Sequence, residues 1–128
     1  MAPLVVDASA LVDVTTNTTE SGDTLARLLD NAQLLAPDHI YIESANALKS
    51  LSRVIAVHHI EQALHEVTRL RIETFRFEEY GALAWNLREN FSLYDAGYVA
   101  VAAITGAPLV TLDKKLAATA RNYCDVVE

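Results

Sequence analysis

Short apolar runs alternate with amphipathic segments along this chain, and this alternation limits the folds that it can adopt. Three runs are too short for helices and suit buried strands: Leu4-Val5-Val6, Leu34-Leu35-Ala36 and Leu109-Val110-Thr111. A fourth segment, Ile72 to Phe77, alternates apolar and polar residues as a half-buried strand does. Helical spacing of apolar residues fills the segments between these runs. We therefore expect an α/β sandwich with a central, mostly parallel sheet flanked by helices.

Capping residues and apolar spacing locate the expected helices. The pattern predicts helices from Ala8, through Leu25 to Leu29, from Ile60 to Leu70, over Glu78 to Asn90, from Ser92 to near Gly106, and a long one from Asp113. Asp38 is expected to cap a further helix, whose apolar stripe is Tyr41, Ala45, Leu48, Leu51 and Ile55. Thr15 to Gly22 is polar and indicates a turn, and Asp125 to Val127 is compatible with a final strand.

Length and composition indicate a single domain over residues 1–128 that buries a real core. The only cysteine, Cys124, excludes an internal disulfide and a cysteine-based structural zinc site. The net charge of −7 argues against indiscriminate binding to nucleic acid. It does not exclude an enzyme acting on nucleic acid whose carboxylates hold cations.

The stretch from Ala96 to Leu112 carries no charge over 17 residues, which is the short limit for a membrane-spanning helix. Gly106, Ala107 and Pro108 interrupt it, so we expect a buried helix followed by a buried strand. The amino terminus lacks the basic region of a signal peptide. The sequence therefore indicates a soluble, cytoplasmic protein with no membrane partner.

Four acidic residues stand at positions that suit a ligand site. Asp7 and Asp113 follow expected strands, and Asp95 lies in the first turn of its helix. The carboxyl ends of parallel strands are where such sheets bind ligands. Glu43 instead lies within a helix, about one and a half turns past Asp38, among small residues. Each of the other three acids also suits a helix cap, so these residues alone leave both interpretations open.

Other candidate residues favour structural roles. Asp13 indicates a helix-surface acid, and His58, His59 and His65 lack the spacing of a zinc site. Cys124 is expected to be buried. Aromatic residues expected in the core are Phe75, Phe77 and Trp85. Basic residues that suit either an RNA path or ordinary solubilising charge are Lys49, Arg53, Lys114, Lys115 and Arg121.

Four blocks of sequence together resemble the PIN-domain family. Val5 to Leu11 resembles its opening motif, and Glu43 to Leu48 resembles its central helix, with an asparagine three residues after the acid. Tyr94 to Ala102 and Leu109 to Leu116 are similar to the third and fourth acidic blocks. The blocks occur in order over nearly the whole chain, at a length typical of the VapC toxins of bacterial toxin–antitoxin pairs.

The resemblance implies a PIN-like three-layer sandwich and a Mg²⁺- or Mn²⁺-dependent endoribonuclease. It implies that the metal is held by Asp7, Glu43, Asp95 and Asp113, with Asn46 and Thr111 as supporting polar groups. Gly97 departs from the family pattern, where a larger residue is usual. The implied partners are an RNA substrate, a cognate antitoxin whose C-terminal segment obstructs the acidic pocket, and a second copy of the chain in a homodimer.

Elementary electrostatics agrees with a metal site. Two carboxylates about 4 Å apart repel by roughly 4 kcal/mol at an effective dielectric constant of 20. Converging acids therefore need shared protons or cations, and Mg²⁺ prefers oxygen ligands. Two alternatives remain: a phosphoacceptor receiver domain, which Glu43 on a helix disfavours, and an inactive PIN domain that only binds, which the presence of all four acids disfavours.

Overall fold

The computed structural model describes residues 1–16 and 20–127. In these residues four parallel strands form one sheet in the order β3-β2-β1-β4. The strands are β1 (Ala2–Val6), β2 (Ala32–Pro37), β3 (Ile72–Phe75) and β4 (Leu109–Val110). Val5 of β1 pairs with Leu35 on one side and Leu109 on the other, which fixes the central register.

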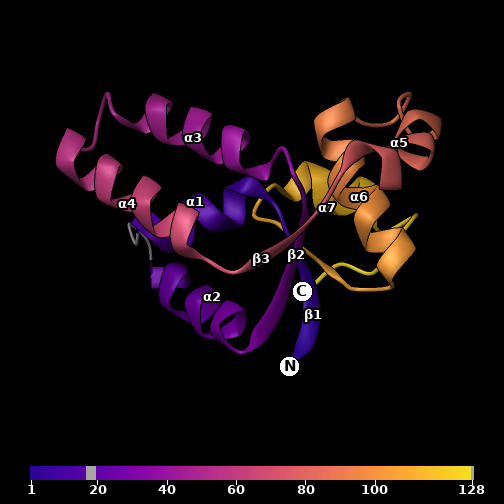
Figure 1. Ribbon diagram of the computed structural model, residues 1–128, viewed down its shortest axis with the longest axis horizontal. Coiled ribbons are helices and arrows are strands. Elements are labelled where there is room, and N and C mark those ends of the chain that lie inside the picture. The colour runs from indigo at the N-terminus through magenta and orange to yellow at the C-terminus, as the bar shows by residue number, and fades with distance from the viewer. Residues whose placement is uncertain (17–19, 128) are drawn as a thin grey trace.

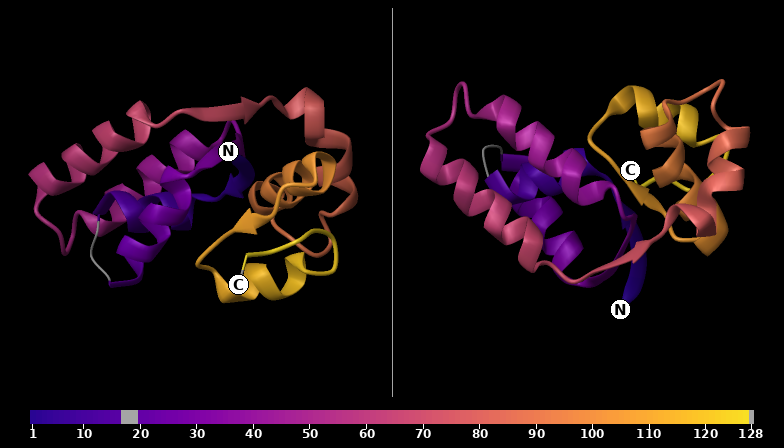
Figure 2. Two further views of the ribbon diagram at one scale, coloured as in Figure 1. Left: turned by 90° about the horizontal axis from the view of Figure 1, so that it is seen from below. Right: turned by 45° about the horizontal axis from the view of Figure 1, so that its top comes forward.

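Helices connect the strands because parallel neighbours need long crossovers. The helices are α1 (Ala8–Thr16), α2 (Glu20–Asp30), α3 (Ile40–Leu51), α4 (Val57–Arg69), α5 (Phe77–Asn86), α6 (Leu93–Thr105) and α7 (Lys114–Ala120). Helices α1 to α4 gather on one side of the sheet and α5 to α7 on the other, as Figures 1 and 2 show. This arrangement confirms the expected α/β sandwich with a parallel sheet between helical layers.

Helix α6 forms the centre of the core. Every residue from Ala96 to Ala102 is buried, and the helix contacts both β1 and β2. It ends at Gly106, whose φ of 75° places it in the left-handed region that favours glycine. The uncharged stretch is thus a buried helix and a buried strand, as expected. No helix in the described part of the chain is long and apolar enough to cross a membrane.

The start of α3 differs from the sequence prediction. The N-cap is His39, without a side-chain capping bond, and the Asp38 backbone N–H instead donates to Phe75 at the end of β3. The buried face of α3 is formed by Ile40, Ser44 and Leu48. The expected stripe is correct from Leu48 onward, since Leu48 is buried and Leu51 and Ile55 pack against its cluster. At the start of α3, Ile40 and Ser44 are buried, whereas Tyr41 and Ala45 are only half-buried.

Two aromatic residues expected in the core lie at the surface. Phe77 and Trp85 are 55% and 54% exposed, whereas α5 buries Tyr80, Gly81 and Ala84. The Phe77 ring lies over Gly81, where a Cβ would approach it to 2.7 Å. Helix α5 thus turns Tyr80 and two small residues inward, towards α6, and leaves Phe77 and Trp85 at the surface.

Several boundaries are also corrected. The third strand ends at Phe75, two residues early, because Phe77 already begins α5, and α5 ends at Asn86 rather than Asn90. Helix α7 is short, ending at Ala120, and only Val126 of the expected final strand forms a bridge, to Leu109. The expected turn is mostly helical, since α1 includes residues 15 and 16 and α2 begins at residue 20; residues 17–19 lie outside the described residues.

Candidate active site

Asp7 is a buried carboxylate at the junction of β1 and α1, with only 5% of its surface exposed. Its Oδ1 accepts bonds from Ser9 Oγ at 2.7 Å and the Ala10 N–H at 3.0 Å, and its Oδ2 accepts one from Thr111 Oγ1. Burial raises the pKa of Asp7, these hydrogen bonds lower it, and the charge of Asp113 raises it further. The side chain is therefore held rigidly at the carboxyl ends of β1 and β4.

Glu43 is fixed from two sides in the first turn of α3. The Tyr98 hydroxyl of α6 donates to its Oε1 at 2.6 Å, and His39 Nε2 lies 3.3 Å from the same oxygen. Burial and the neighbouring Glu43 raise the pKa of Tyr98, so its hydroxyl remains a donor. This contact attaches the helix-borne acid to α6, the helix that also carries Asp95.

Asp95 brings the four acids into one electrostatic group. It is half-buried in the first turn of α6, where its N–H donates to Ser92 Oγ at 3.1 Å. Burial and, after it, the charges of Glu43, Asp113 and Asp7 together raise its pKa to about 6, against the lowering effect of the Ser92 hydrogen bond. Three acids from other segments of the chain therefore act on the carboxyl group of Asp95.

Asp113 has the helix-capping role that the sequence predicted as one of two alternatives. Its Oδ1 accepts bonds from the backbone N–H groups of Lys115 and Leu116, both at 3.0 Å, at the start of α7. It is exposed and lines a pocket of about 270 Å³ together with Asp95. Capping therefore does not remove Asp113 from the acidic group.

Comparison with known proteins identifies the family to which this chain belongs. A family model of the PIN domain matches residues 4–122. The chain belongs to the PIN-domain family. Relatives from Mycobacterium tuberculosis include Ribonuclease VapC1, 34% identical over 98% of this chain and 97% of the relative. Another, Ribonuclease VapC3, is 32% identical over 89% of this chain and 85% of the relative.

Solved structures share the architecture of this PIN domain. PAE2754 from Pyrobaculum aerophilum superposes with a TM-score of 0.67 at 25% identity, over 98% of this chain and 84% of that one. Mycobacterium tuberculosis VapC20, described as a sarcin-ricin loop cleaving toxin, superposes with a TM-score of 0.70 at 16% identity, over 98% and 99%. At that identity the likeness to VapC20 is one of fold alone. Membership of the PIN family sets aside the receiver-domain alternative.

The acidic group of this PIN domain suits a hard divalent cation in its chemistry. Its donors are carboxylate oxygens, and their mutual repulsion disfavours full ionisation without a cation. In the described residues no three acidic, histidine or cysteine side chains converge closely enough to hold an ion by themselves. The fit is thus to an ion that keeps several waters, as Mg²⁺ does, with some carboxylates reaching it through water.

His39 is a site residue that the sequence analysis missed. Its Nε2 lies 3.1 Å from the Tyr94 carbonyl as well as near Glu43, and its Nδ1 lies 3.3 Å from the Tyr80 hydroxyl. Both neighbours of Nε2 are acceptors, so this nitrogen carries a proton. His39 thus joins α3, α5 and α6 around Glu43.

Gly97 provides the space for His39. A Cβ at this position would lie 2.6 Å from His39 Cε1 and 3.2 Å from Tyr80 Cε1. The departure of Gly97 from the family pattern therefore has a structural reason in this chain. That departure, together with the four-residue spacing of His39 and Glu43, is the sequence signal that could have revealed the contact.

The remaining predicted residues are distributed around the site. Thr111 contacts Asp7, and Asn46 is exposed beside Glu43. Asp13 is half-buried and lines a different pocket with Ser9, so the structure places it less superficially than the sequence predicted. The three histidines of α4 are exposed, and Cys124 is half-buried against the core.

Proposed function

We propose that this PIN domain is a divalent-metal-dependent endoribonuclease that acts as the toxin of a toxin–antitoxin pair. The observation that carries the proposal is the convergence of acids from separate segments: Asp95 and Asp113 line one pocket, and Asp7 is hydrogen-bonded to Thr111 at the end of β4. Burial and the charges of Glu43, Asp113 and Asp7 accordingly raise the pKa of Asp95. The names of the relatives, Ribonuclease VapC1 and VapC3, support RNA as the substrate.

In the proposed mechanism the acids have distinct environments. Asp7 is rigid because three donors hold it, and it anchors the site on the sheet. Glu43 either binds the ion or orients a water, and its contact with Tyr98 fixes its carboxylate for both roles. Asp95 and Asp113 complete the oxygen donor set. A bound Mg²⁺ or Mn²⁺ would lower the pKa of an attacking water and offset the charge of the scissile phosphate.

The proposal includes two protein partners. One is a cognate antitoxin whose C-terminal segment obstructs the acidic pocket, and the other is a second copy of the chain. An unneutralised carboxylate group offers bidentate pairing to an arginine of such a segment. Both partners follow from the family resemblance and are tested by co-expression below.

Incubation of purified RNA with the protein, with and without Mg²⁺ or Mn²⁺, tests the proposed metal-dependent ribonuclease activity. We expect cleavage that stops with excess EDTA and is lost in Asp7→Asn, whereas Asp13→Asn behaves as the wild type does. Undiminished cleavage in EDTA contradicts the metal mechanism. Inactivation by Asp13→Asn but not by Asp7→Asn contradicts the site assignment.

A further inference from the structure

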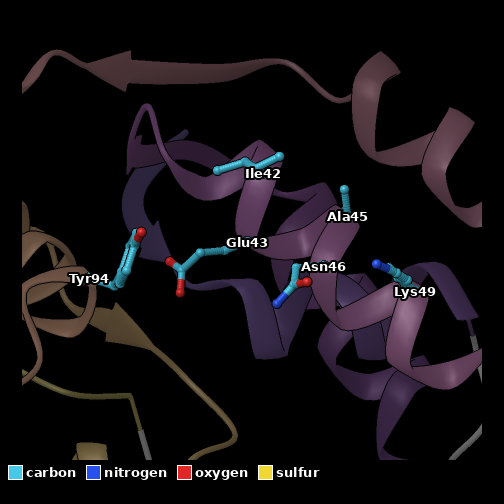
Figure 3. A pocket seen from close by; sticks show the side chains of 6 residues that line it. All are labelled: Ile42, Glu43, Ala45, Asn46, Lys49 and Tyr94. Atoms are coloured by element: carbon cyan, nitrogen blue, oxygen red, sulfur yellow. The ribbon is translucent and has the colours of Figure 1, made fainter.

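A pocket of about 560 Å³ opens beside Glu43, on the side of α3 that faces the start of α6. We call it the Tyr94 pocket; it is lined by Ile42, Glu43, Ala45, Asn46, Lys49 and Tyr94. In Figure 3, Tyr94 faces Glu43 at one end, and Asn46 and Lys49 follow along α3. Its volume lies within the range of ligand sites.

We propose that the Tyr94 pocket binds one unpaired nucleotide of the RNA substrate, adjacent to the phosphodiester that the acids address. The inference rests on the proposed function and adds the form of RNA that the site accepts. Glu43 belongs both to the acidic group and to the pocket wall, so the pocket lies directly beside the position of a strand bound at the acids.

Tyr94 provides the surface for the base. Its side chain is 58% exposed although it is large and aromatic, and it immediately precedes Asp95 in the chain. Ile42, 67% exposed, adds an apolar wall. Unpaired RNA bases bind proteins by stacking on such aromatic side chains, whichever base is present.

Lys49 provides a positive charge where a phosphate needs one. It stands six residues after Glu43 on α3, so about 9 Å of helix separates their backbones. Its ammonium therefore meets a different phosphate from the one at the acids. In a chain with a net charge of −7, a lysine in this pocket offsets repulsion of the RNA. Asn46, between the two, offers both a donor and an acceptor to a base edge.

His39 holds the Tyr94 surface in place before any RNA arrives. Its ring lies 5.3 Å from the Tyr94 ring at an interplanar angle of 85°, and its Nε2 lies 3.1 Å from the Tyr94 carbonyl. Gly97 admits this ring to the space between the helices. A fixed aromatic surface loses little freedom on binding, which favours affinity.

The chemistry of the pocket selects unpaired RNA. In an A-form duplex the bases are stacked inside the helix, so none can reach Tyr94 and the strand near Glu43 together. A loop or single strand can place one base there while its phosphates contact Lys49 and the acids.

Binding of short labelled RNA to the Asp7→Asn chain in Mg²⁺ tests the proposal without requiring cleavage. We expect Tyr94→Ala to weaken binding of a random single-stranded pool about tenfold, and Tyr94→Phe, which keeps an aromatic face, to change it by no more than about twofold. Neither substitution should change binding of duplex RNA of the same length. Lys49→Gln should lower the salt dependence of log Kd by about 0.7, the contribution of one phosphate contact in single strands.

Matched surface variants provide the controls. Trp85→Ala removes an aromatic residue of similar exposure from α5, and Arg69→Gln removes an exposed charge at the end of α4. If these variants weaken binding as much as Tyr94→Ala and Lys49→Gln do, or if Tyr94→Ala has no effect, the pocket proposal is overturned. If the wild type cleaves RNA and Tyr94→Ala cleaves it equally well, the pocket proposal is overturned and the proposed function stands. Tyr94-dependent binding by a wild-type chain that never cleaves RNA supports the pocket and contradicts the proposed function.

Discussion

The pKa of Asp95 depends on the charges of the other acids in the site. Its pKa is raised from 3.8 to about 6 by burial and by three nearby acids. The folded chain therefore binds this proton more tightly than the unfolded chain does. Below about pH 4 Asp95 is protonated in both states and its raised pKa does not affect the free energy of unfolding. As the pH rises, this raised pKa increasingly destabilises the folded chain, and the effect is complete above about pH 6.

We therefore predict that metal-free Asp95→Asn protein is more stable than the wild type near pH 7, by about 1–2 kcal/mol. One pKa unit corresponds to about 1.4 kcal/mol, and solvent screening of this half-buried group reduces the total. The advantage should disappear near pH 4, where Asp95 is protonated in both states. Urea unfolding in EDTA across this pH range measures it, and a difference that is constant with pH contradicts the prediction.

The packing of Gly97 against His39 can also be tested by substitution. The His39 ring occupies the space that a side chain at position 97 would need. In isolation, Gly→Ala in a helix interior stabilises by about 1 kcal/mol. Here the new Cβ would meet the His39 ring, and overpacking costs about 1–3 kcal/mol. We predict that Gly97→Ala is neutral to destabilising and slows cleavage in the wild-type background.

In a His39→Ala background the same Gly97→Ala change should stabilise the chain, because the ring is gone. A double-mutant cycle on unfolding free energies isolates this coupling, which should exceed about 0.5 kcal/mol. His39→Ala alone should reduce cleavage through a less fixed Glu43 while leaving Tyr98 as its donor. Additive effects would show that the two positions do not share the space.

At the scale of elements, the sequence predicted correctly those helices, strands and caps that depend on residues close together in the chain. The Ala96–Leu112 stretch could be divided into α6 and β4 because a glycine and a proline separate two apolar runs. The caps at Ser92 and Asp113 could be predicted because capping bonds are local. The start of α3 could not, since the Asp38 N–H bonds to Phe75, which is remote in sequence. The contact of Tyr98 with Glu43 is equally remote and left no local signal.

Helix α7 allows the capping and active-site roles of Asp113 to be separated. Asparagine caps helices about as well as aspartate, whereas alanine costs about 1 kcal/mol. We predict that Asp113→Asn preserves the unfolding free energy but strongly reduces metal-dependent cleavage, and that Asp113→Ala loses both. Urea unfolding and RNA cleavage measured on the same preparations check this. An active Asp113→Asn enzyme would restrict this residue to capping.

For the whole molecule, parallel topology gathers residues that are remote in sequence. Asp7 and Thr111 are 104 positions apart yet hydrogen-bonded, because β1 and β4 are parallel neighbours whose carboxyl ends coincide. The sheet topology thus explains why Asp7 and Asp113 lie at the same edge of the sheet. Glu43 and Asp95 come from helices on opposite sides of the sheet, and their approach depends on helix packing rather than strand pairing.

The proposed antitoxin is the partner that this whole-molecule charge distribution suits. Without metal the acidic group is unneutralised, and an arginine of a bound segment can pair with it bidentately. Exposed apolar side chains near the turn between α3 and α4, Val54 at 81% and Val57 at 61%, provide further contacts for an amphipathic segment. The resemblance to VapC toxins implies that the gene beside this one encodes the antitoxin. We predict that expression of this chain alone arrests growth and degrades RNA, and that co-expression of the neighbouring gene or the substitution Asp7→Asn restores growth. The Asp7→Asn chain should still co-purify with the product of the neighbouring gene, since three acids remain. Light scattering of the free chain should give the mass of a dimer.

Harmless expression of folded protein, with no product of the neighbouring gene co-purifying, would contradict the toxin assignment. If that same protein cleaved RNA in vitro, it would be a nuclease with another role.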